Sequence, residues 1–343
     1  MPTKQTNNRE VKLVRHVRGD VRLEDFVIAD TIIPAPGPHD VVVRNRWFRV
    51  SISTRLMAQD DAKAAEGIPF PPLTPGDTLA DGAIGEVIEA GPACGIAVGS
   101  LVQHPLGWRD YAMVHEHDCK PVDGDDPDPA AYLGHGWTAY AALTRGVRVK
   151  DGDTVFVSSG AGAIGSMAGQ IARLLGARRV VGSTSTRDKA RWMQDELGYD
   201  AVVTRDGGSV VEQLAKAAPD GVDVIVDMVG GEQLAAAVSL AKDDARCVLL
   251  GALTAEMNAE KASLQAPVTL DSFHIIFKGM TLRGFSADHS PDAFDVWIRD
   301  LKAWTRDGRI HLPKTTYKGL ERAVSALQDA CAGHLKGVVL IEL

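Results

Sequence analysis

The sequence lacks the features that define membrane, secreted and nucleic-acid-binding proteins. No stretch approaches the roughly 18 consecutive apolar residues of a membrane-spanning helix, which argues against a membrane protein. The first residues are polar and contain no apolar block of the kind found in secretory signals, so we expect a cytoplasmic protein. The formal net charge of −8 argues against a broad nucleic-acid surface, because phosphate binding depends on clustered Lys and Arg.

Cysteine is scarce and widely spaced. The four cysteines, Cys94, Cys119, Cys247 and Cys331, never form the close pairs from which structural zinc sites are built. We therefore expect reduced, unpaired thiols and no metal site.

The 343 residues exceed what one hydrophobic core usually serves, so the length predicts two domains. Short β-segments separated by Gly, Pro and Asp run from Val11 to about Val122, whereas strands and helices alternate after Pro127. We predict a β-rich domain over residues 1–125 and a doubly wound α/β domain of Rossmann type over residues 126–309. The last segment, 310–343, ends in the apolar strand VVLIEL, which we expect to complete the sheet of the first domain.

The strongest single motif is the segment TVFVSSGAGAIG at residues 154–165, a buried strand leading directly into a glycine-rich turn and an amphipathic helix. Gly160 and Gly162 allow the backbone to turn tightly beside a pyrophosphate, and Gly165 permits close contact between helix and sheet. Free amides at the start of the helix would face the anion. The motif therefore predicts a dinucleotide site.

The end of the next strand distinguishes NADP from NAD. NAD-binding domains usually carry an acidic residue there, which bonds the ribose hydroxyls, but this chain has the sequence GSTSTR at residues 182–187. Without that carboxylate a 2′-phosphate meets no repulsion, and Ser183, Lys189 and Arg205 supply donors and positive charge. The sequence favours NADPH, although solvated surface positions remain an alternative for Lys189 and Arg205.

Two further segments place small residues directly after strands, DMVGG at 227–231 and LGAL at 250–253. Ligands of parallel sheets bind at the carboxyl ends of the strands, so we expect both segments to border the cofactor. A structural role in ending the strands is the alternative for their glycines.

In this domain order the chain resembles the medium-chain dehydrogenase/reductase superfamily, in which a GroES-like β-barrel domain precedes a Rossmann domain. Its similarity to the prostaglandin reductase, alkenal double-bond reductase and curcumin reductase branch is carried by the following stretches: PFPPLTPGDTLADGAIGEVIEAG, GWRDYAMV, LGHGWTAYAAL, DGDTVFVSSGAGAIGSMAGQIARLLGA and ELGYDAVV. This resemblance implies NADPH-dependent, metal-free reduction of a carbon–carbon double bond conjugated to a carbonyl. The cysteine and Gly-His-Glu segment of zinc-dependent relatives are absent.

The resemblance also implies roles for individual residues. Gly162, Ala163, Ile164 and Gly165 would meet the pyrophosphate, and Lys189 the 2′-phosphate, with Arg205 at the adenosine end. The remaining cofactor contacts implied by position are Thr138, Val229, Gly251, Ala252, Leu253, Phe285, Ser286 and His334.

The expected catalytic residues lie where the chain departs from the branch. Arg55 replaces an aromatic hydroxyl near the cleft, and its guanidinium makes it a candidate for stabilising charge on the substrate carbonyl. Its alternative is a surface salt bridge. Asp288 and His289 are candidate proton donors together with His135, and His is favoured because its pKa lies near neutrality. Water is the alternative proton source.

Three other functions remain open at this stage. A quinone or carbonyl reductase of the same superfamily would share the cofactor residues, and an enoyl reductase acting on a carrier-bound intermediate would use Arg44, Arg46, Arg49 and Arg55 at the cleft mouth. A non-catalytic NADPH-binding protein would bind the coenzyme without turnover. The expected partners are a small activated alkene or quinone and, by resemblance, a second copy of the chain in a homodimer.

Overall fold

A computed structural model describes residues 6–60, 72–124, 128–258 and 263–343; the start of the PFPPL segment, residues 69–71, lies outside this part of the chain. The described residues divide into two compact units. The first unit holds the residues up to Leu133 together with Lys314–Leu343, and the second holds Gly134–Asn258 and Ser263–Pro313. The division falls after Leu133 rather than after residue 125 because helix α2 (Pro129–Leu133) packs on strands of the first unit.

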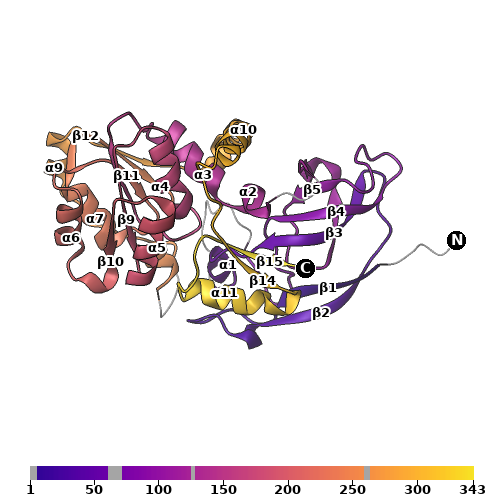
Figure 1. Ribbon diagram of the computed structural model, residues 1–343. Helices are drawn as coiled ribbons and strands as arrows, with labels where there is room; N and C mark the ends of the chain where they lie inside the picture. The colour runs from indigo at the N-terminus through magenta and orange to yellow at the C-terminus, as the bar shows by residue number, and fades with distance from the viewer. Residues whose placement is uncertain (1–5, 61–71, 125–127, 259–262) are drawn as a thin grey trace. The chain divides into compact units, whose positions relative to one another are not determined.

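The first unit is built on a mixed sheet in the order β14-β15-β3-β4-β5-β7, with β6 paired to β3 (Figure 1). Its strands are β3 (Asp40–Arg49), β4 (Ala83–Ala90), β5 (Leu101–His104), β6 (Tyr111–His115), β7 (Lys120–Pro121), β14 (Lys314–Lys318) and β15 (Val338–Glu342). The apolar closing strand β15 pairs antiparallel with β3 and parallel with β14, as the sequence predicted. The unit also contains helix α1 (Ser53–Met57) and helix α11 (Ala323–Cys331).

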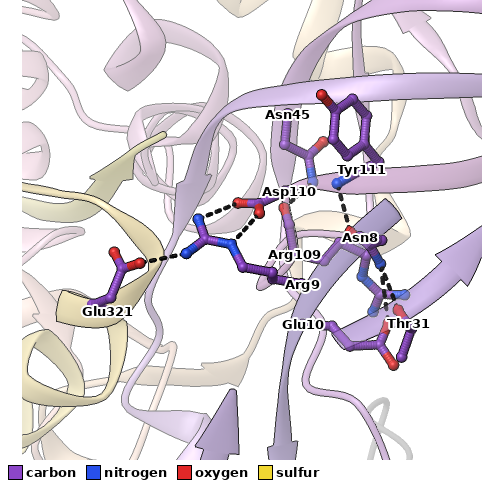
Figure 2. Close-up of polar contacts among 9 residues, drawn as sticks. All are labelled: Asn8, Arg9, Glu10, Thr31, Asn45, Arg109, Asp110, Tyr111 and Glu321. Carbon is purple, nitrogen blue, oxygen red and sulfur yellow. Dashed lines mark hydrogen bonds and ion pairs between the residues drawn. The ribbon is translucent and has the colours of Figure 1, made fainter. Parts of the chain in front are cut away.

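A separate antiparallel pair, β1 (Thr6–Leu13) and β2 (Phe26–Ile33), belongs to the same unit. Figure 2 shows the polar contacts that attach β1 to its surroundings. The guanidinium of Arg9 donates to the carboxylates of Asp110 and Glu321, and Asn8 accepts a hydrogen bond from the backbone amide of Tyr111 (2.9 Å). Segments distant in the sequence are thus joined by charge-assisted bonds.

The second unit is a parallel sheet in the order β10-β9-β8-β11-β12-β13 (Figure 1). Its strands are β8 (Thr154–Val157), β9 (Arg179–Thr184), β10 (Ala201–Thr204), β11 (Val222–Asp227), β12 (Ala241–Leu249) and β13 (Thr281–Gly284). Every residue of β8 is buried, as expected for a parallel strand covered on both faces. The predicted fold class is confirmed: a Rossmann sheet accompanied by a GroES-like β-domain.

Helices precede, connect and follow the strands of this sheet. They are α3 (Gly136–Ala141), α4 (Gly165–Leu174), α5 (Arg187–Leu197), α6 (Val210–Ala217), α7 (Gly231–Ser239), α8 (Leu253–Glu256), α9 (Ser272–Phe277) and α10 (Asp292–Arg306). Local signals set their ends: the side chain of Thr186 caps the amide of Lys189 at the start of α5, and Gly198 ends α5 at φ +70°. In the described part of the chain, no helix has both the length and the apolar character needed to cross a bilayer.

Candidate functional site: the carboxyl edge of the parallel sheet

The order of the strands determines where a ligand can bind in the second unit. Strands β8, β9 and β10 extend to one side of the sheet and β11, β12 and β13 to the other. The chain therefore reverses its direction of growth between β8 and β11, and the loops that follow these two strands diverge. A crevice at this switch point is the general binding position in such sheets.

The glycine-rich turn lies at the carboxyl end of β8. Ser159 adopts a left-handed conformation at φ +52°, which is unusual for a residue other than glycine. The amide of Gly160 donates to the carbonyl of Ser183 (2.7 Å), and the amide of Gly162 donates to the carbonyl of Ser159 (3.0 Å). The turn leads into α4 at Gly165, and the amides of Ser166 and Met167 donate to the carbonyls of Gly162 (2.9 Å) and Ile164 (3.1 Å), which joins the helix to the turn.

Glycine is required in this turn because neighbouring atoms approach it closely. A Cβ on Gly165 would lie 2.6 Å from the Cα of Gly160, and one on Gly162 would lie 3.1 Å from the hydroxyl of Ser159. The atoms that a Cβ would meet belong to the turn itself, so glycine at these positions lets the turn close tightly onto the start of α4, as in pyrophosphate-binding loops.

Tyr199, which the sequence patterns did not single out, packs against the glycine-rich turn and the start of α4. Its buried ring packs directly on Gly182, because a Cβ built on that glycine would lie only 2.6 Å from Cε1 of the ring. The hydroxyl of Tyr199 donates to the carbonyl of Gly165 (2.6 Å). Burial raises the pKa of this phenol well above its ordinary value, so it remains a donor. Gly169 within α4 and Gly182 within β9 were the available signal, since glycine inside a helix or strand marks a close approach.

The end of β9 carries no carboxylate over residues 182–187, which leaves this position open to a phosphate. Lys189 is buried in the first turn of α5, and Arg205 is exposed just after β10. Ser183 is buried, and its hydroxyl accepts from the amide of Ser159 (3.1 Å) and donates to Gln233 of α7. The structure therefore directs the hydroxyl of Ser183 to the turn, which does not favour the predicted donation to a phosphate.

A buried carboxylate connects the two sides of the switch point. The hydroxyl of Ser158, directly after β8, donates to Asp227 at the end of β11 (2.8 Å) and accepts from the amide of Met228 (2.8 Å). Asp227 also accepts from the amides of Gly230 (2.8 Å) and Val229 (3.3 Å). Burial raises the pKa of Asp227, and these donors oppose the rise.

The other predicted cofactor residues of the second unit follow the remaining strands. Gly251, Ala252 and Leu253 come after β12, where the amide of Leu253 donates to the carbonyl of Met228 (2.9 Å). Phe285 and Ser286 come after β13, and the amide of Phe285 donates to the carbonyl of Leu249 (3.1 Å). Because parallel strands end at one edge, these segments and the glycine-rich turn share that edge. Thr138 is half-buried on α3, which contacts α4.

The predicted catalytic residues have contrasting surroundings. Asp288 and His289 are exposed in the short turn after β13, where Ser286 accepts from the amide of Asp288 (3.3 Å). Arg55, in α1 of the first unit, is only 2% exposed, and its Nε donates to the carbonyl of Gly19 (2.9 Å). Because the side chain is buried and bonded to the backbone, the structure favours a structural role for Arg55. It supports neither of the two roles considered above, a contact with the substrate or a salt bridge at the surface. His334 is exposed in the first unit, 3.6 Å from Asp329.

The arginines of β3, considered above for a cleft mouth, are paired with carboxylates. Arg44 and Arg46 both donate to Glu86 (2.8 and 2.9 Å), and Arg49 donates to Asp81 (2.6 Å). Among the described residues, no three His, Cys, Asp or Glu side chains are arranged to hold a metal ion.

The strand order and the glycine-rich turn define a dinucleotide-binding protein of Rossmann type. Two family profiles match the chain: "Zinc-binding dehydrogenase" over residues 163–302 and "N-terminal domain of oxidoreductase" over residues 9–122. The putative NADP-dependent oxidoreductase YfmJ of Bacillus subtilis (strain 168) is 31% identical over 342 residues, which cover 98% of each protein. The chain therefore belongs to the medium-chain dehydrogenase/reductase superfamily, in its zinc-independent branch, and the resemblance seen in the sequence is confirmed.

Two further comparisons extend over nearly the whole chain. The NADPH-dependent curcumin reductase of Escherichia coli (strain K12) is 27% identical, with 99% of this chain and 98% of that protein covered. The crystal structure of CurA from Vibrio vulnificus in complex with NADPH superposes with a TM-score of 0.87 at 26% identity, covering 97% of this chain and 98% of that chain.

Proposed function

We propose that this protein is an NADPH-dependent reductase that transfers a hydride to the double bond of a small α,β-unsaturated carbonyl compound without a metal. The glycine-rich turn at the start of α4 carries this proposal, because it follows β8 at the switch point of the sheet and has no room for a Cβ at Gly165, which would meet the backbone of Ser159 and Gly160. The relatives support it, since proteins described as NADP-dependent oxidoreductase and NADPH-dependent curcumin reductase match nearly the whole chain.

The coenzyme supplies the hydride when it is bound, and the protein positions it. Gly162, Ala163, Ile164 and Gly165 would hold the pyrophosphate. Lys189 and Arg205 would provide the charge that favours the 2′-phosphate. The nicotinamide ring would lie among Thr138, Val229, Gly251, Ala252, Leu253, Phe285 and Ser286, of which all but Thr138 follow the strands β11, β12 and β13.

The proposed function is tested by measuring NADPH oxidation with 2-alkenals, enones, quinones and acyl thioesters, with NADH in parallel. Turnover of alkenals or enones with a preference for NADPH is the expected result. Turnover of quinones alone would indicate a quinone reductase, and turnover of acyl thioesters alone an enoyl reductase. Calorimetric binding of NADPH with no turnover of any acceptor would indicate a binding protein.

Coenzyme preference is tested by replacing Lys189 and Arg205 together with alanine. The double variant is expected to raise the KM for NADPH by at least about tenfold and to leave the KM for NADH nearly unchanged, since the lost charge acts only on the 2′-phosphate. The matched control is K216A/R191A, which removes one lysine and one arginine from α6 and α5. Equal effects on both coenzymes would reject the assignment.

For the proton we propose His289, whose exposed position after β13 leaves it open to solvent exchange. H289Q is expected to lower kcat with little change in the KM for NADPH. Asp288→Asn serves as the neighbouring comparison. An unchanged kcat in both variants would assign the proton to water.

We propose that the protein is a cytoplasmic homodimer that pairs through α9 and the edge strand β13. Phe273, Ile276 and Phe277 of α9 are 66%, 67% and 77% exposed, although the adjacent Ile275 packs into the core of the unit. Such an apolar group beside an edge strand is typical of an interface. F277D is expected to convert a dimer to a monomer in light scattering, whereas V98D, at another exposed apolar position, should not. A monomeric wild-type protein would reject the proposal, and cell fractionation tests the location.

A further inference from the structure

Ser183 has a hydroxyl whose hydrogen-bonding capacity is used inside the protein. A serine hydroxyl has one proton to donate, and here that proton goes to Oε1 of Gln233. The oxygen accepts the amide proton of Ser159 at 3.1 Å. With the side chain only 1% exposed, its orientation is set by these two partners.

The backbone of Ser183 holds the next residue of the same turn. Its carbonyl accepts the amide of Gly160 at 2.7 Å, so two consecutive amides of the glycine-rich turn bind one residue of β9. Ser159, the first of the two, has φ +52°. A serine in this conformation is strained by about 1 kcal/mol or more and persists only where its surroundings hold it.

Gln233 extends the contact to a third element. It lies in the first turn of α7, the helix that follows β11 at the switch point. By accepting the proton of the hydroxyl of Ser183, it leaves the oxygen lone pairs for the amide of Ser159. Gln233 thus acts on the turn through Ser183.

We propose that Ser183 and Gln233 are positioning residues that hold the glycine-rich turn in its pyrophosphate-binding shape. Their contribution is to the half of the coenzyme that NADPH and NADH share, and the 2′-phosphate is left to other residues. This inference rests on the proposed function for its ligand, but the contact between the two side chains and the turn exists in the free protein.

The test compares the dissociation constants of NADPH and NADH for S183A and Q233L by calorimetry. Each variant is expected to bind both coenzymes about tenfold more weakly, with the ratio of the two constants unchanged. The double variant should be no weaker than either single variant by more than about twofold, because both act through one contact. S239A, at the far end of α7, is the matched control and should bind as the wild type does.

Amide hydrogen exchange of the coenzyme-free protein supplies a second readout. Exchange at Ser159 and Gly160 is expected to accelerate in both S183A and Q233L and to stay unchanged in S239A. Weaker binding of NADPH alone in S183A would overturn the proposal and make Ser183 a direct phosphate ligand. Unchanged exchange and affinity in Q233L would also overturn it, and this arm stands if S183A does not fold. If the wild type binds neither coenzyme, the proposed function fails, whereas the exchange data still report on the contact.

Discussion

The buried histidine of the first unit, His104, leads to a prediction about stability and pH. Its ring is 3% exposed at the end of β5. Nε2 faces the amide oxygen of Asn45 at 2.9 Å, and Nδ1 accepts the amide proton of Leu106 at 3.2 Å. The neutral ring with its proton on Nε2 satisfies both partners, whereas a second proton on Nδ1 would displace the donor at Leu106.

Burial, with a smaller effect of the nearby Arg109, lowers the pKa of His104 to about 3 from an ordinary value of 6.5. The folded state therefore releases a proton that the unfolded chain binds below pH 6.5. The contribution of His104 to the free energy of unfolding is complete above that pH. It decreases as the pH falls towards 3, with a slope of about 1.4 kcal/mol per pH unit. Between pH 6.5 and pH 5 this amounts to about 2 kcal/mol.

The assay is urea unfolding of the wild type and H104Q at pH 7, 6.5, 6, 5.5 and 5. H104Q starts from a lower free energy of unfolding because glutamine fits these partners less well, but its curve should be flatter by about 2 kcal/mol over this range. His334→Gln, at an exposed position, should keep the wild-type slope. Between pH 7 and pH 5 the carboxylates of Glu86 and Glu116 stay charged, because hydrogen bonds lower their pKa values, so they add nothing to the measured slope. Parallel curves for wild type and H104Q would refute this reasoning, as would an NMR titration showing that His104 becomes charged above pH 5.

Three further predictions concern the turn and the buried arginine. Tyr199→Phe removes the bond to the carbonyl of Gly165 and should lower the free energy of unfolding by about 1 kcal/mol in urea titrations, with Tyr111→Phe as a comparison. Gly165→Ala places a Cβ 2.6 Å from the Cα of Gly160 and so must displace the backbone of the turn. Calorimetry should detect no NADPH binding, while the protein remains folded but less stable by about 1–3 kcal/mol. Binding at the wild-type affinity would contradict this requirement for glycine. Arg55→Leu leaves the carbonyl of Gly19 without its charged donor and should cost about 1–3 kcal/mol, with an unchanged KM for an alkenal in the folded protein; a large rise in KM without loss of stability would restore the substrate role.

Much of the architecture follows from local patterns in the sequence. Fully apolar strands such as TVFV at 154–157 mark a parallel sheet covered on both faces, and the glycine spacing after it marks the turn and the helix that begins at Gly165. The apolar segment at the end of the chain needed a sheet to join, and it pairs with β3. These inferences succeed because burial and backbone conformation depend on residue type at short range.

The sequence by itself determined the class of fold, the position of the glycine-rich turn and the lack of a carboxylate after β9. Only the tertiary structure decided that the hydroxyl of Ser183 meets Ser159 and Gln233, that Tyr199 packs beneath the turn, and that the guanidinium of Arg55 is enclosed. The physical reason is that a polar side chain's partner comes from whichever distant segment packs beside it. Residue type states which bonds a group can make, whereas packing selects the one it does make.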